Sequence, residues 1–156
     1  MTSPRPARAI GRVGRVGRGA TRVVGRALIA AAFVHGGAAT LNDPGPRAEV
    51  AADFLARLRG AIPWLPADLT LVRLNAAAQV AAGTLLATGA WERQTAQVLA
   101  ASLVPTTIAG HPAWAAADPE SRAAEAIQLG KNLGLLGGLL LLACGWAGQS
   151  QRQQTG

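Results

Sequence analysis

The sequence predicts an all-α protein built as a four-helix transmembrane bundle, with a short interfacial helix between spans one and two. Half of the 156 residues are hydrophobic and only 15% are charged. The apolar residues gather in four blocks that nearly all the charges avoid, whereas a helix of a soluble protein carries a polar stripe along its whole length. The four tryptophans lie near the block ends, where indole rings prefer the headgroup layer of a membrane.

The four apolar blocks define the predicted spans. They cover residues 23–41, 69–90, about 95–110 and about 128–147. A helix needs about 20 residues to cross a bilayer, so the third block, which reaches this length only with residues 91–94, is the weakest. The last block carries Gly130, Gly134 and Gly138 at four-residue spacing, which lets another helix approach closely within lipid. We expect these glycines to lie in a helix contact.

Residues 44–66, between the first two blocks, predict the interfacial helix. Apolar side chains recur there at helical spacing with charged residues between them, as expected for a helix that lies in the outer membrane interface. The apolar positions are Val50, Phe54, Leu55, Leu58 and Ile62. Before the last block, Asp118-Pro119-Glu120 is a typical helix start.

The basic residues predict the orientation of the chain. The first 26 residues carry seven arginines and no acid, and Lys and Arg near span ends are held on the cytoplasmic side. With four spans, both termini are then cytoplasmic, and the chain is a multi-pass protein of the plasma membrane with the lipid bilayer as its partner. The net charge of +7 is a topology signal, so we expect no nucleic acid as a partner.

The predicted organisation has three parts: a basic cytoplasmic tail at 1–22, a four-span membrane domain at 23–147 and a short polar tail at 148–156. The N-terminal arginines recur every three or four residues, which predicts a helix lying on anionic lipid. The glycines among them weaken that helix and favour an unstructured flank. A secretory signal peptide with residues 27–34 as its apolar core is a third interpretation.

Several motifs carry a family resemblance. They are Gly36-Gly37, Leu41-Asn42-Asp43-Pro44-Gly45-Pro46-Arg47, Gly83-Thr84-Leu85-Leu86-Ala87-Thr88-Gly89, Leu103-Val104-Pro105-Thr106-Thr107, Gly110-His111-Pro112-Ala113-Trp114, Asp118-Pro119 and Lys131-Asn132-Leu133-Gly134-Leu135-Leu136-Gly137-Gly138-Leu139-Leu140. Over roughly residues 22–147 the chain resembles the DoxX family of small integral membrane proteins. The resemblance implies a four-helix membrane bundle, in a family linked to quinol oxidation and to thiosulfate or redox-stress pathways. The family often has a His and an aromatic residue where Gln128 and Leu129 stand, so a role that depends on that His is not expected here.

The residues that could carry chemistry are few. Cys144 is the only cysteine, so the chain has no dithiol, and we expect this residue to pack as a small apolar group. The two histidines, His35 and His111, lack the Cys/His spacing of a zinc site, and we expect no metal. The sequence contains no nucleotide-binding glycine loop and no recognisable pair of nucleophile and base. No cofactor site is evident in the chain itself.

Polar residues within the blocks gather at one membrane depth. If the first block runs outward, seven of them fall in the outer half of the bilayer or at its edge: His35, Arg73, Asn75, Gln79, His111, Lys131 and Asn132. Ionisable residues at membrane depth are costly and usually face the bundle interior, so this set predicts an outward-facing polar pocket. In the alternative interpretation, Asn and Gln join helices by hydrogen bonds, while Arg73 and Lys131 extend to the membrane surface.

Two functions from different classes follow. In the first, the chain is a redox-linked subunit whose pocket binds a quinone or another small substrate, while a partner redox protein carries the electrons. Lys, Arg, Asn and His would then donate hydrogen bonds to the quinone carbonyls. In the second, the chain is a non-catalytic membrane scaffold or carrier whose polar cluster only packs helices. The sequence leaves open whether the chain catalyses a reaction and whether it forms a homo-oligomer.

Overall fold

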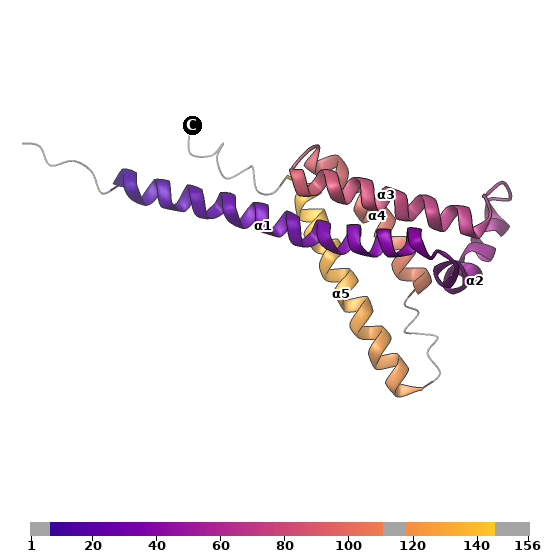
Figure 1. Cartoon of the computed structure of the whole chain (residues 1–156). Coiled ribbons are helices and arrows are strands. Elements are labelled where there is room, and N and C mark those ends of the chain that lie inside the picture. Colours follow the sequence, from indigo (N-terminus) through magenta and orange to yellow (C-terminus); the bar gives the residue numbers. More distant parts are fainter. Residues whose placement is uncertain (1–6, 111–117, 146–156) are drawn as a thin grey trace, which may run out of the picture.

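The computed structural model describes residues 7–110 and 118–145, with side chains from residue 19 onward. Its regular structure in these ranges is entirely helical, as Figure 1 shows: α1 (Ala7–Asn42), α2 (Gly45–Ala61), α3 (Asp68–Thr88), α4 (Glu92–Gly110) and α5 (Pro119–Ala143). The all-α prediction is confirmed. Within the described residues, three helices are long and apolar enough to cross a membrane, namely α1 over Gly19–Asn42, α3 and α5.

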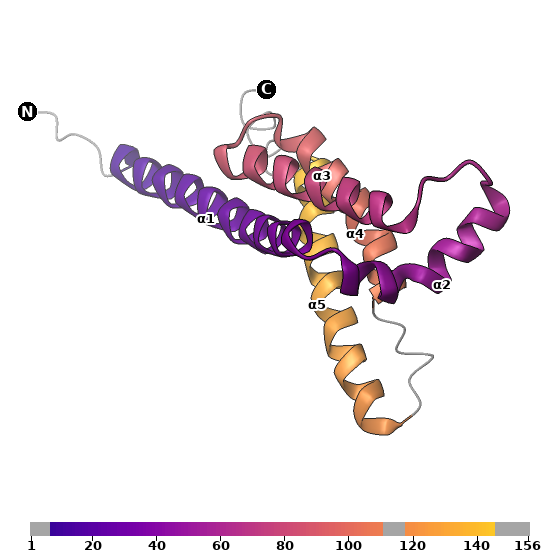
Figure 2. The same cartoon turned by 45° about the vertical axis from the view of Figure 1, so that its right-hand side comes forward.

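The first helix is longer than its apolar block. It runs for 36 residues from Ala7 without a break, so the basic segment is helical, and the unstructured flank that the glycines favoured is wrong. Starting a helix is unfavourable, but an existing helix is extended without a new nucleation step, and each added residue forms one hydrogen bond. The apolar half, packed in the bundle, therefore supports the weaker half, which extends beyond the other helices (Figures 1 and 2). The predicted boundary at residue 22 falls inside this helix.

The remaining helix starts follow the local sequence. The short helix predicted between the first two spans is confirmed as α2, whose buried residue is Leu55. Asp118 caps α5 by accepting a hydrogen bond from the Ser121 amide, and Pro119 occupies the first turn, where its missing N–H is not needed. Hydrogen bonds from Ser121 also lower the pKa of the Asp118 carboxyl. The helix start predicted at Asp118 is therefore confirmed, and α5 begins before the apolar block at residue 128.

Helices α1 and α3 run antiparallel, and they pack closely because each presents a glycine to the other. A Cβ added at Gly37 of α1 would lie 2.8 Å from the carbonyl oxygen of Ala76 and 2.9 Å from Cγ2 of Val80. A Cβ added at Gly83 of α3 would lie 2.9 Å from Cγ2 of Val34. Only residues without a side chain let the two backbones approach this closely. The two helices lie side by side in both views (Figures 1 and 2).

The core lies where four helices meet. Leu86 of α3, Leu99 of α4 and Leu139 of α5 are the largest fully buried side chains. The other buried members of this cluster are Phe33, Ala82, Ala96, Ala100, Leu103 and Ala143. The many alanines keep the helices close together, and α4 packs against both α3 and α5.

Helix α5 diverges from the bundle toward its N-terminal end (Figures 1 and 2) and buries residues only near its C-terminal end. A Cβ at Gly138 would lie 3.2 Å from Cδ1 of Ile29, so this glycine does lie in a helix contact. A Cβ at Gly130 or Gly134 would meet no other described atom within 4 Å. Among the described residues of a single chain these two glycines make no close helix contact, because this part of α5 points away from the other helices, and their contact with another helix stays a prediction.

Charged residues hold one end of the bundle together. Glu92, at the start of α4, accepts hydrogen bonds from Arg22 Nη2 at 2.6 Å and from Arg26 Nη1 at 2.8 Å, both on α1. The next residue, Arg93, donates from Nε to the carbonyl oxygen of Ala143 at 3.1 Å, near the end of α5. The basic half of α1, the turn between α3 and α4, and the C-terminal end of α5 therefore lie at the same end, opposite α2.

A candidate ligand pocket

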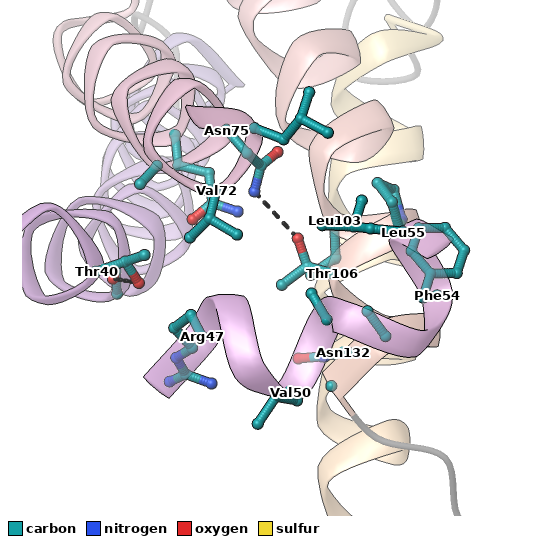
Figure 3. Close-up of a pocket in the computed structure, with 18 of the residues that line it drawn as sticks. Thr40, Arg47, Val50, Phe54, Leu55, Val72, Asn75, Leu103, Thr106 and Asn132 are labelled. Atoms are coloured by element: carbon teal, nitrogen blue, oxygen red, sulfur yellow. Dashed lines mark hydrogen bonds between the residues drawn. The ribbon is translucent and has the colours of Figure 1, made fainter. Parts of the chain in front are cut away.

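A cavity of about 400 Å³ lies at the α2 end of the bundle, and all five helices contribute to its wall. Most of the wall is apolar, with Phe54 and Leu55 of α2 and Leu103 of α4 among its larger side chains. The polar lining residues are Thr40, Arg47, Asn75, Gln79, Thr106 and Asn132. Figure 3 shows Arg47 on α2, across the pocket from Asn75 of α3.

A chain of hydrogen bonds joins α3 and α4 along one wall of the pocket. Gln79 Nε2 donates to Ser102 Oγ at 2.9 Å, and Ser102 Oγ donates to Asn75 Oδ1 at 2.8 Å. Asn75 Nδ2 donates in turn to Thr106 Oγ1 at 3.3 Å (Figure 3). Asn75 and Gln79 are four residues apart, as are Ser102 and Thr106, so each pair lies on one face of its helix. The two faces meet, and the hydrogen bonds alternate between α3 and α4.

The remaining hydroxyl groups direct their protons to the backbone. Thr106 donates to the carbonyl oxygen of Ser102 and Thr107 to that of Leu103, each at 2.7 Å. Thr40 donates in the same way to the carbonyl oxygen of Gly36 at 2.9 Å. These hydroxyl oxygens can therefore accept a further hydrogen bond but have no proton left to donate.

Helix α5 reaches the pocket through Asn132. Its Nδ2 donates to Thr107 Oγ1 at 3.0 Å, which ties α5 to α4 at the level where α5 begins to diverge. Asn132 and Leu135 are the α5 residues on the wall. The amide of Asn132 keeps one N–H and its carbonyl oxygen without a partner among the described residues, so it can bind a ligand without giving up its helix contact.

The family model that matches this chain is that of DoxX, over residues 21–112, which is more than half of the sequence. The chain belongs to the DoxX family. The comparison with curated proteins and the comparison with solved structures each gave no match. The matched segment runs from the apolar part of α1 to just beyond α4. It includes every residue on the pocket wall except Asn132 and Leu135 of α5.

Three of the seven predicted site residues of this DoxX-family protein lie on the pocket wall, namely Asn75, Gln79 and Asn132. His35, Arg73 and Lys131 are exposed and do not line it, so the structure does not bring these three into the same site. The reason is rotation about the helix axis: at 3.6 residues per turn, a side chain one residue along a helix points about 100° away and one two residues along points about 200° away. His111 lies outside the described residues.

Sequence reasoning missed four polar residues of this region: Thr40, Arg47, Ser102 and Thr106. The i, i+4 spacing of Ser102 and Thr106, which repeats that of Asn75 and Gln79, is a signal that could have identified them. Arg47 carried no such signal, because its place on the wall depends on how α2 folds back over the bundle.

Within the described ranges, no group of three or more His, Cys, Asp or Glu side chains could hold a metal ion. Cys144 is exposed and forms the C-cap of α5. The expectation that it packs as a small apolar group is wrong, because the last buried turn of the helix ends at Ala143.

Proposed function

We propose that this membrane protein of the DoxX family is a redox-linked subunit whose pocket binds the headgroup of a quinone, or of a small substrate with similar groups. The cavity of about 400 Å³ is the observation that carries the proposal. Pockets for small molecules measure about 300–1,000 Å³ and combine apolar walls with a few placed polar groups. This cavity has both features.

The polar groups on the wall suit the carbonyl oxygens of a quinone. Asn75 and Asn132 each keep one amide N–H beyond the hydrogen bonds that join the helices. Phe54, Leu55 and Leu103 supply apolar surface for the ring and the start of its chain. The residues of this chain would bind and orient the ring and keep water away from it, while a partner redox protein supplies or takes up the electrons.

The pocket faces outward if the basic half of α1 is cytoplasmic. We include this orientation in the proposal, together with a fourth crossing of the plasma membrane by α4. Its 19 residues span about 28 Å at 1.5 Å per residue, close to the hydrocarbon thickness of about 30 Å. Its buried polar residues, Thr95 and Ser102, contact protein and not lipid. With four crossings both termini are cytoplasmic, and the α2 end of the bundle lies outside.

The test fills the cavity and measures quinone binding. Ala51 lines the pocket on α2, whereas Ala56, on the same helix, is exposed and does not. A short-chain benzoquinone is titrated into purified protein in lipid nanodiscs, with heat of binding as the signal. We expect Ala51→Trp to weaken binding by about tenfold or more, about 1.4 kcal/mol, and Ala56→Trp to leave it unchanged. Equal binding by both variants and the parent would place the ligand elsewhere.

One observation favours the second function, a scaffold or carrier without catalysis. The hydrogen bonds from Gln79 through Ser102 and Asn75 to Thr106 satisfy much of the polar cluster within the protein. Such interhelical bonds stabilise membrane proteins by about 0.6 kcal/mol each on average. If the parent protein releases no heat with quinone and its melting temperature does not change, this second function becomes the better one.

A further inference from the structure

Arg47 is the one charged side chain among the described residues that line the cavity. It lies near the start of α2, is exposed, and shares the wall with apolar residues of the same helix (Figure 3). The acids closest to it along the chain, Asp43 and Glu49, do not line the cavity. A ligand in this pocket therefore meets a positive charge and no carboxylate.

Several other arginines of the bundle have partners within the protein. Arg22 and Arg26 bind Glu92, and Arg59 pairs with Asp68. No hydrogen bond or ion pair joins Arg47 to any residue within the described ranges. Its guanidinium group carries five N–H donors in a planar arrangement that matches two oxygen atoms of an anion. These donors are free to bind a ligand.

The other groups on the wall do not supply a charge. The hydroxyl protons of Thr40 and Thr106 are used within the protein. The side-chain donors that remain are one amide N–H on each of Asn75, Gln79 and Asn132, together with the guanidinium of Arg47. Neutral amide donors bind a neutral or an anionic oxygen, but only Arg47 distinguishes between the two by charge.

We propose that the ligand of this pocket is an amphiphile with an anionic headgroup, which Arg47 binds while the apolar wall encloses the rest. This inference rests on the proposed function and narrows it from quinones in general to those with an acidic oxygen, or to compounds of the same chemistry. Charge-assisted hydrogen bonds are about twice as strong as neutral ones. An exposed arginine is partly screened by solvent, so the preference is modest.

The test compares two ligands that differ in charge and in a single methyl group. One is a 2-hydroxy-1,4-naphthoquinone with an alkyl chain at C3, which is an anion at neutral pH, and the other is its neutral methyl ether. We expect the anion to bind the parent about three to ten times more tightly than the ether. Arg47→Gln should remove this preference, and Arg47→Lys should restore part of it. Arg57→Gln, an exposed position of α2 outside the pocket, is the matched control.

The outcomes separate this inference from the proposed function. If the two ligands bind equally to the parent and to Arg47→Gln, the charge preference is refuted while the pocket remains. If neither ligand binds, the pocket itself is refuted. Acetate, an anion without an apolar tail, should not displace the hydroxynaphthoquinone. Displacement by acetate at similar concentration would show that the pocket binds free anions, and it would refute the proposal that the ligand is an amphiphile.

Discussion

At the residue scale, Gly89 has a role beyond that of ending a helix. It ends α3 with φ of 82°, in the left-handed region that residues with a side chain rarely adopt. A Cβ at this position would lie 3.0 Å from Cζ and from both terminal nitrogens of the Arg26 guanidinium. The glycine therefore ends the helix and also leaves room for Arg26 to reach Glu92.

We predict that Gly89→Ala destabilises the protein. The left-handed backbone alone costs about 1–2 kcal/mol for a residue with a Cβ, and the Arg26 guanidinium must also move. Gly25→Ala is the matched control, because Gly25 lies inside α1 and a Cβ there meets nothing within 4 Å. That change should stabilise the helix by about 0.5–1 kcal/mol. Thermal unfolding in mild detergent measures both, and equal stability of Gly89→Ala and the parent would contradict the argument.

At the element scale, the tightest helix contact is that between α1 and α3 at Gly37 and Gly83. We predict that Gly37→Leu prevents correct packing, because its Cβ would lie 2.8 Å from a carbonyl oxygen of α3 and overpacking costs about 1–3 kcal/mol or more. Gly134→Leu, on the open face of α5, should change the stability of a single chain by about 0.5 kcal/mol or less.

Size-exclusion chromatography and thermal unfolding in mild detergent distinguish the two variants. Gly37→Leu should elute as aggregate or unfold at a lower temperature, whereas Gly134→Leu should behave as the parent. A large loss of stability in Gly134→Leu would contradict the open face and indicate that a second copy of the chain covers it.

The helices could be predicted from the sequence better than their contacts. Apolar blocks and the Asp118 cap depend on local sequence, so the all-α class and the start of α5 follow from them. Glycine spacing pointed to α5, but spacing says nothing about which helix is the neighbour. Depth along the helices pointed to Asn75 and Gln79, which do line the pocket, whereas His35 and Arg73 have similar depth but point in another direction around their helices. The contribution of α2 to the pocket depends on the tertiary fold.

At the scale of the whole molecule, side-chain contacts show which helix ends lie together at each end of the bundle. Glu92 pairs with Arg22 and Arg26, and Arg93 donates a hydrogen bond to the end of α5. The turn between α3 and α4 therefore lies beside the basic half of α1. The pocket lies at the other end, with α2. If the arginines of α1 hold that end in the cytoplasm, as positive residues near spans do, the pocket belongs to the outer side.

We predict the side of the membrane on which three exposed positions lie, by labelling single cysteines with a membrane-impermeant thiol reagent. The natural cysteine is first removed by Cys144→Ser. Trp64→Cys, between α2 and α3, and Ala123→Cys, at the start of α5, should react in intact cells. Trp91→Cys, in the turn between α3 and α4, should react only after the membrane is opened.

Each pair of neighbouring positions tests a different crossing. Opposite results at Trp64 and Trp91 require that α3 crosses the membrane, and opposite results at Trp91 and Ala123 require the same of α4. The second pair matters most, because α4 is not among the three helices that length and apolar composition identify as spans. If Ala123→Cys and Trp91→Cys react alike, α4 does not cross. The start of α5 would then lie on the same side as the turn between α3 and α4, and the chain would have three crossings.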